Sequence, residues 1–407
     1  MQMEAFLDLK KNGRLLLVSA AAILVGLLVG VVDMIFGVVL NALTVFRDSH
    51  FLFLIPFLSL SGLLIVFLYD HFGGKSIKGM GLVFDVADER EKAIPKRLVP
   101  LAIFSTWLTH LFGGSAGREG VAVQIGAALS HAFSPIFSFK ESSRSFLIIG
   151  IAAGFAGLFQ TPIAAILFAL EVLVIGRLEL AALLPTCLAA YTASYTSHLL
   201  GLKKFTRSIE VNMELNPLLF LKFALLGILF GLTGTLFAYL LRRTKLALVL
   251  RFRRPYQRIM IIGLLLSVLL IVLGMGRYSG LSTDLIAASF SKDGNVYPFD
   301  WFFKLILTVL TLSAGYQGGE VMPMFTIGAT LGAVLAPLFH LPADFVAALG
   351  YASVFGSGTG TFLAPIFIGG EIFGFDNIPY LFIVVCFASI IKKRISVYGA
   401  QKTSSKI

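Results

Sequence analysis

The sequence predicts an all-α polytopic membrane protein from three observations: its composition, its series of apolar segments and the short charged loops between them. Apolar residues make up 57% of the 407 residues and charged residues only 14%, with a mean hydropathy of +0.90. No soluble core needs so large an apolar fraction. The apolar segments fall at residues 15–43, 51–69, 98–112, 121–134, 146–159, 162–175, 180–200, 217–241, 259–274, 302–314, 325–339, 343–357, 361–374 and 378–391.

The lengths of these segments narrow the class further. The first, at 15–43, is too long for a signal-peptide core and has no small-residue cleavage site, so we interpret it as a retained span. Several others are shorter than the ~20 helical residues that cross a hydrocarbon core. Broken helices are tolerated in a membrane only where they are buried in protein or line a cavity, so the pattern indicates a channel or transporter.

The basic residues set the expected orientation. The chain has 33 Lys and Arg against 22 Asp and Glu, and the positive charges gather in short loops beside apolar segments, as the positive-inside rule requires. This distribution explains the excess without a nucleic-acid partner. It predicts a multi-pass protein of the plasma (inner) membrane with both termini in the cytoplasm. The basic clusters lie at residues 10–14, 75–97, 242–258 and 392–406.

The cysteines and histidines suggest neither a metal site nor a cofactor. Cys187 and Cys386 lie separately inside apolar segments, which indicates packing rather than a disulfide framework. His110 and His131 flank helix ends without metal-ligand spacing, so we interpret both as hydrogen-bonded packing residues.

The rest of the chain is organised around the stretch Gly113-Gly-Ser-Ala-Gly-Arg-Glu-Gly-Val-Ala-Val-Gln124. A glycine-rich turn that opens a helix leaves backbone N–H groups pointing at one place, where the helix dipole favours an anion. Glu119 lies in this turn. A carboxylate there either occupies the anion site itself or takes up a proton and leaves it.

The turn is repeated in the second half of the chain. Ala314-Gly-Tyr-Gln-Gly-Gly-Glu320 echoes Gly113 to Glu119, and the series Phe155, Thr161, Glu171 returns at Phe355, Thr361, Glu371. Two halves with broken helices in corresponding positions predict a site at the repeat interface. We expect half-repeats at 1–205 and 206–407, joined through the polar stretch 201–217.

Four segments at membrane depth carry a resemblance to a known family. They are the turns Gly79-Met-Gly-Leu-Val83, Gly117-Arg-Glu-Gly-Val121 and Gly319-Glu-Val-Met-Pro323 and the late Tyr398. Their order and spacing resemble the CLC family of anion channels and anion/proton exchangers, in which such turns and a helix-start tyrosine surround the permeating anion. The resemblance covers nearly the whole chain and extends to Gly154 through Glu171.

The departures from the family pattern resemble its fluoride/proton exchanger branch, the CLC-F proteins. Chloride-handling members carry a serine where this chain has Met80, a proline where it has Val121 and an apolar residue where it has Glu320. The inner proton-transfer glutamate of chloride/proton exchangers is Val172 here. Together these differences imply transport of fluoride and protons.

The resemblance assigns roles to individual residues and to the assembly. It implies that Glu119 is the gating and proton-coupling glutamate, and that Tyr398 directs its phenol at the anion. It also implies a CLC-like inverted repeat of tilted, partly broken helices, a homodimer in lipid with a pore in each subunit, and a chain end at Ile407 that leaves no room for cytoplasmic CBS domains. The expected anion-binding residues are Gly79, Met80, Gly81, Gly117, Arg118, Gly120, Val121, Gly319, Val321, Met322 and Tyr398.

Some roles stay open at this point. Glu320 is either a second proton or hydrogen-bond station or an N-cap for the helix that begins near Pro323. Arg118 fits a structural role that orients its turn, and we expect Glu171 and Glu371 to be structural anchors.

Three functions are compared. The leading one is a fluoride/proton antiporter that exports fluoride from the cytoplasm, with fluoride resistance as the result. The alternative is a chloride/proton exchanger or a passive CLC-type anion channel. An intramembrane serine protease using Ser115 and His110 leaves Glu119 and the repeated turn without a role, so we expect a transporter and not an enzyme.

Overall fold

The computed structural model describes residues 2–137, 139, 141–211, 213–291, 293–391 and 395–403, with the backbone alone described for residues 2–12. Part of the basic cluster expected at the C-terminus lies outside these residues: Lys392, Lys393, Arg394 and Lys406.

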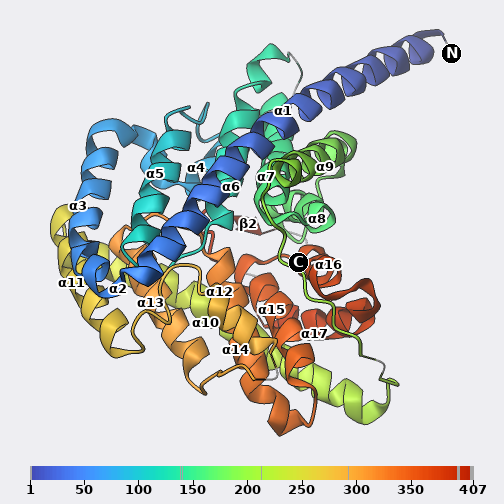
Figure 1. The fold of residues 1–407 in the computed structure, drawn as a ribbon. Coiled ribbons are helices and arrows are strands. Elements are labelled where there is room, and N and C mark those ends of the chain that lie inside the picture. Colours follow the sequence, from blue (N-terminus) through green and yellow to red (C-terminus); the bar gives the residue numbers. More distant parts are fainter. Residues whose placement is uncertain are drawn as a thin grey trace.

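The described chain is a bundle of helices with one small pair of strands (Figure 1). The helices of the first half are α1 Gln2–Ser49, α2 Phe51–Leu54, α3 Leu58–Leu68, α4 Met80–Ala87, α5 Leu98–Leu111, α6 Glu119–His131, α7 Ser142–Phe159, α8 Pro162–Val172 and α9 Leu183–Leu199. Those of the second half are α10 Pro217–Arg251, α11 Pro255–Val272, α12 Thr283–Ser289, α13 Asp300–Ala314, α14 Val321–Phe339, α15 Ala343–Thr359, α16 Leu363–Phe373 and α17 Ile378–Ile390. The strands β1 Val174–Ile175 and β2 Lys402–Thr403 pair in parallel.

Six helical stretches of the described residues are long and apolar enough to cross a membrane, and four further apolar helices are shorter. This confirms the expected mixture of spanning and broken helices. Two helices were not anticipated. The stretch at 79–83 was expected as a turn, yet α4 begins at Met80, and α12 had no apolar segment to mark it. Helices of seven or eight residues are too short to leave a clear apolar run.

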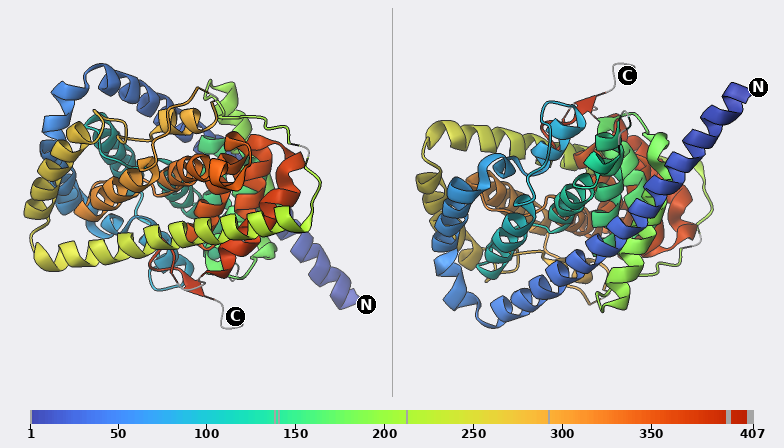
Figure 2. Two further views of the ribbon diagram at one scale, coloured as in Figure 1. Left: turned by 90° about the horizontal axis from the view of Figure 1, so that it is seen from below. Right: turned by 90° about the horizontal axis from the view of Figure 1, so that it is seen from above.

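Two helix pairs cross in a similar way. The pairs α6 and α7, and α14 and α15, cross where glycines face each other, so that a Cβ on Gly126 would clash with Gly150 and one on Gly328 with Gly350. Without side chains at these points the helix backbones approach closely. Figure 2 shows the long α10 running across the outside of the bundle, while the N-terminal end of α1 projects beyond it.

Crossed carboxylates join the halves. Glu171 at the end of α8 accepts hydrogen bonds from the backbone N–H groups of Leu363 (2.7 Å) and Phe362 (2.9 Å) at the start of α16. Glu371 of α16 accepts from Ala164 (2.8 Å) and Ile163 (3.2 Å) at the start of α8. Each short helix therefore caps the N-terminus of the other, in agreement with the structural role expected for both acids.

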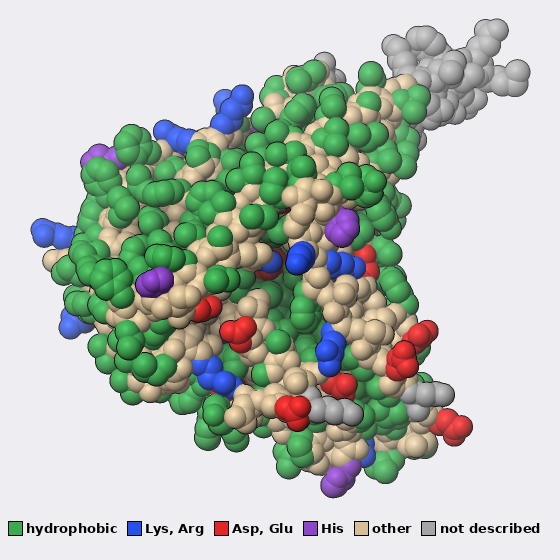
Figure 3. All heavy atoms as spheres, viewed as in Figure 1, with side chains coloured by type: hydrophobic (Ala, Val, Ile, Leu, Met, Phe, Trp, Pro, Cys, Tyr) green, Lys and Arg blue, Asp and Glu red, His purple; other side chains and the backbone are tan. Residues whose placement is uncertain are grey.

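Buried side chains from both halves form one large core, with smaller clusters around α3, α11 and α13 and around α1, α7 and α9. Hydrophobic side chains also cover much of the outer surface (Figure 3). A helical protein with apolar residues both inside and outside is suited to lipid surroundings.

Candidate functional site

The two repeated turns meet and hold each other. The N–H of Gly117 donates to the carbonyl of Gly319, and the N–H of Gly319 donates back to the carbonyl of Gly117, both at 2.7 Å. The α6 and α14 helices start just beyond this bridge, so their N-terminal ends converge from different halves of the chain. In this structure the amides of Gly117 and Gly319 are engaged with each other rather than open to an anion.

Glu119 is completely buried at this junction. Its Oε2 accepts a hydrogen bond from the backbone N–H of Arg118 (3.2 Å), and the backbone N–H of Met322 in the other turn also faces the carboxylate. Its Oε1 has no hydrogen-bond donor, and the Arg118 Nε lies 3.6 Å away. The carboxylate thus rests among backbone donors of both turns, at the place where converging helix N-termini favour a negative charge.

Arg118 is anchored from the other side. Its guanidinium donates to the Asn41 Oδ1 on α1 at 2.7 Å, while its backbone N–H serves Glu119. The residue therefore links the turn to α1, which matches the orienting role expected for it.

The second acid, Glu320, approaches the first turn closely. A Cβ on Gly120 would lie 3.0 Å from the Glu320 Oε2, so Gly120 leaves room for this carboxylate. The Glu320 side chain makes no capping hydrogen bond at the start of α14. The bond that the N-cap alternative requires is therefore not made. Val121, Val321 and Met322 are buried around the junction.

The third turn lies beside α6. Gly79 has φ +53° and ψ −127°, a backbone conformation that residues with a Cβ rarely adopt. A Cβ there would lie 3.3 Å from the Oε1 of Gln124. Met80 is buried at the start of α4, whereas a Cβ added at Gly81 would have nothing within 4 Å.

Tyr398 closes the same region. It is 5% exposed, its ring packs against Phe84 of α4 with centroids 5.5 Å apart, and it lies within electrostatic range of Glu320. Its hydroxyl is buried and makes no hydrogen bond with the described residues. The backbone is fixed by Ser396, whose Oγ accepts from the Tyr398 N–H at 3.2 Å. All four segments singled out in the sequence are thus brought to one region.

Sequence reasoning missed several residues of this region. Tyr351 of α15 is fully buried, stacks on Phe325 with centroids 4.0 Å apart, has an unpaired hydroxyl and lies within electrostatic range of Glu119. Gln124 was not predicted as a site residue, although it ends the glycine-rich stretch that begins at Gly113. Both residues could have been found in the sequence as lone polar residues within apolar segments. The same signal marks Asp33 and Lys304, which are both fully buried.

The residues set aside in the sequence behave as packing or structural groups. His110 is buried and its ring nitrogens lie 2.9 Å and 3.1 Å from the carbonyl oxygens of Thr106 and Ala116, and His131 pairs with Ser143. The Ser115 hydroxyl contacts Lys304 and Thr308, whereas the His110 ring faces the carbonyl oxygens of Thr106 and Ala116, so the protease pairing is not formed. The described residues contain no group of three His, Cys, Asp or Glu side chains that could hold a metal ion.

Comparisons with known proteins agree with this arrangement. A family model described as voltage gated chloride channel matches residues 61–393. A chloride/fluoride channel protein from Pseudomonas syringae pv. tomato is 36% identical over 395 residues, which cover 94% of this chain and 86% of that protein.

Two solved structures extend the comparison. A CLC-type fluoride/proton antiporter has a TM-score of 0.94 and 52% identity, covering 96% of this chain and 98% of that one. A slow cyanobacterial Cl⁻/H⁺ antiporter, with a TM-score of 0.79 and 21% identity, covers 92% of this chain and 93% of its own and shares the fold. The chain therefore belongs to the voltage-gated chloride channel family, the CLC family that its repeated turns resemble.

Proposed function

We propose that this protein is a fluoride/proton antiporter that exports fluoride from the cytoplasm in exchange for protons. The observation that carries the proposal is the buried Glu119 carboxylate, which lies among backbone donors of two converging helix starts. The similarity to a CLC-type fluoride/proton antiporter over nearly the whole chain supports the choice of ion.

The geometry suggests how exchange proceeds. As a carboxylate, Glu119 fills the cradle and excludes a mobile anion. Once protonated it loses its attraction to the backbone donors and leaves the cradle to fluoride. Since one group carries the proton and vacates the anion position in the same movement, the two fluxes are coupled.

Other residues complete the proposed path. The unpaired hydroxyl of Tyr398 supplies a donor to the anion, and Met80 with Val321 shapes the cavity on the side where chloride-handling relatives use a serine. Glu320, which has no capping bond, serves as a second proton or hydrogen-bond station. Uphill export requires the inward proton gradient, so we place the protein in the plasma membrane with both termini cytoplasmic.

The competing function is a chloride/proton exchanger or a passive anion channel. The name of the Pseudomonas relative, a chloride/fluoride channel protein, favours keeping this alternative. Met80, Val121, Val172 and Glu320 depart from the chloride pattern and favour fluoride.

The experiment is ion efflux from proteoliposomes containing the wild-type protein, loaded with fluoride or with chloride, while the external pH is recorded. The proposal requires fluoride efflux with stoichiometric proton uptake and much slower chloride efflux. Equal rates for the two halides, or fluoride efflux without proton movement, would refute it.

A further inference from the structure

Lys304 of α13 is a buried cation outside the site described above. Its side chain is inaccessible to solvent. The Nζ donates to the carbonyl of Gly280 (2.7 Å), to the Oγ of Ser115 (3.0 Å) and to the carbonyl of Tyr278 (3.3 Å). An ammonium group has three N–H donors, so every one of them has a partner.

These bonds connect α13 to the turn that carries Glu119. Ser115, four residues before Glu119, also exchanges a hydrogen bond with the Thr308 hydroxyl at 3.0 Å, and its backbone N–H donates to the Thr311 Oγ1 at 3.3 Å. Residues 304, 308 and 311 lie on one face of α13. This face of α13 therefore holds the Glu119 turn through its contacts with Ser115.

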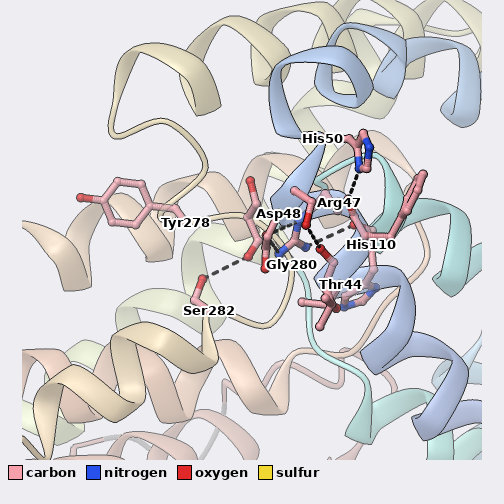
Figure 4. A network of polar contacts seen from close by, with 12 residues as sticks. Thr44, Arg47, Asp48, His50, His110, Tyr278, Gly280 and Ser282 are labelled. Atoms are coloured by element: carbon pink, nitrogen blue, oxygen red, sulfur yellow. Dashed lines mark hydrogen bonds and ion pairs between the residues drawn. The ribbon is translucent and has the colours of Figure 1, made fainter.

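The loop before α12 is tied to the same turn. Gly280, whose carbonyl accepts from Lys304, donates its own N–H to the carbonyl of Gly114 at 3.1 Å. Figure 4 shows this neighbourhood, with Arg47 reaching toward Gly280 and His110. Arg47 donates to the carbonyl of His110 at 3.2 Å, so it borders the same region from α1.

The charges around Lys304 do not balance locally. Arg47 pairs with Asp48 at 2.7 Å, and Arg277 with Asp300 at 2.6 Å. Asp300, one helical turn before Lys304, is also bound by the Tyr278 hydroxyl. Within the described part of the chain, Lys304 forms no ion pair with a carboxylate.

The charged and titratable groups that face Lys304 increase this imbalance. Arg47 from α1 repels it, and His110 from α5 lies within electrostatic range of both cations. The ring nitrogens of His110 face two carbonyl oxygens, and the side chain contributes no negative charge. A buried cation is costly unless a negative charge compensates it.

Along the chain, Glu119 is the acid nearest to Ser115, the residue that Lys304 holds. Glu119 lies four positions after Ser115, so their Cα atoms are at most about 14 Å apart even in a fully extended chain. We propose that Lys304 is a positioning residue for transport: it fixes the Glu119 turn through Ser115, and its unpaired positive charge favours an anion in the cradle, either the Glu119 carboxylate or fluoride. This inference rests on the proposed function.

The repeat shows that the arrangement belongs to one turn only. The residue sixteen positions before Glu320 is Lys304, whereas the residue sixteen positions before Glu119 is the apolar Ile103. In the second turn, Tyr316 stands where the first has Ser115, and its hydroxyl donates to the Leu58 carbonyl at 2.9 Å. Lys304 therefore has no counterpart in the other repeat, and within the described residues its side chain donates hydrogen bonds only to the turn that carries Glu119 and to the loop before α12.

A catalytic role for the Ser115 and Lys304 pair does not fit the structure. A serine nucleophile with a lysine base must reach a substrate carbonyl, but both side chains have no solvent exposure. The hydrogen bond between Lys304 and Ser115 instead holds the Glu119 turn against α13.

The test compares Lys304→Met, Lys304→Gln, Lys304→Arg and Ser115→Ala in the proteoliposome assay, after checking that each variant is monodisperse. Loss of the charge is expected to raise the fluoride KM about fivefold with little change in kcat, which is the size of effect for two unit charges roughly 15 Å apart at an effective dielectric constant of ~20. Because the anionic form of the site is then less favoured, the pH of half-maximal transport should move upward by about half a unit.

The controls separate charge from anchoring and from the proposed function. Lys304→Arg keeps the charge and should stay within about twofold of wild type, and Ser115→Ala should leave the pH profile in place. A KM and pH profile of Lys304→Gln or Lys304→Met equal to wild type would overturn the inference, as would the same pH shift in Ser115→Ala. If the wild type itself moves no fluoride against protons, the proposed function fails instead.

Discussion

At the scale of single residues, sequence reasoning was strongest where a charged residue lay in a recognisable turn. Glu119 could be singled out because a carboxylate beside several glycines at a helix start has few purely structural uses. The burial of Lys304 and its bonds to Ser115 could not be derived, because they depend on how α13 meets a turn almost 200 residues earlier in the chain. The two hydrogen bonds between the backbones of Gly117 and Gly319 could not be derived from the sequence either.

Tyr398 provides a test at this scale. Its hydroxyl makes no hydrogen bond within the described protein, so Tyr398→Phe removes a donor that only a ligand uses. A hydrogen bond to a charged partner contributes about 1.5–3 kcal/mol, so the fluoride KM should rise at least tenfold while the melting temperature stays the same.

Tyr316→Phe is the matched control for that substitution. The Tyr316 hydroxyl is buried and bonded to the Leu58 carbonyl, so its removal should cost about 1 kcal/mol of stability and leave the fluoride KM unchanged. If Tyr316→Phe raised the fluoride KM, and Tyr398→Phe lowered the melting temperature without raising the KM, Tyr398 would have no part in anion binding.

At the scale of elements, the apolar segments predicted most of the helices, and the structure agrees with the expected segments within a few residues at most ends. The exceptions, α4 and α12, are short helices fixed by their neighbours rather than by an apolar run of their own. The small residues Gly150 and Gly154 of α7 pack directly against α6.

The crossing of α6 and α7 predicts the effect of a larger residue. Gly126→Leu places a side chain against the backbone of Gly150, and overpacking of this kind costs about 1–3 kcal/mol or more. We expect a lower melting temperature in detergent. Gly13→Ala, at a helical position with nothing within 4 Å, is the control and should be neutral or slightly stabilising. Equal stability of both variants would show that the helices are not tightly apposed.

The crossed acids of α8 and α16 predict a stability effect without a transport effect. Glu171→Gln and Glu371→Gln each weaken hydrogen bonds from a carboxylate to two or three helix N–H groups, which should cost about 1 kcal/mol or more per site. Thermal unfolding in detergent measures this loss, with the exposed Glu214→Gln as control. Loss of proton coupling in either variant, with stability intact, would instead assign these acids to the proton path.

At the scale of the whole molecule, the sequence predicted the membrane class and the family, since composition and ordered turns are properties of the chain itself. The surface through which subunits would associate could not be predicted from the sequence, because apolar side chains suit both a lipid-facing and a subunit-facing surface. The CLC resemblance supports a homodimer, and we propose that its contact lies on α9, α16 and α17.

Cross-linking tests that proposal. With Cys187 and Cys386 replaced by Ala, a cysteine at the exposed Tyr195 of α9 should form a disulfide-linked dimer under mild oxidation, while one at the exposed Leu264 of α11 should not. Cross-linking only at Leu264 would place the contact on the other side of the bundle.

The central claim is that Glu119 couples the two ions, and proton uptake during fluoride efflux by Glu119→Gln measures it most directly. The amide cannot take up the proton but has nearly the same shape, so fluoride should still cross while the external pH stays constant. The wild type in the same experiment should take up protons in a fixed ratio to fluoride. Proton uptake by Glu119→Gln in the wild-type ratio would contradict the account and assign coupling to another residue.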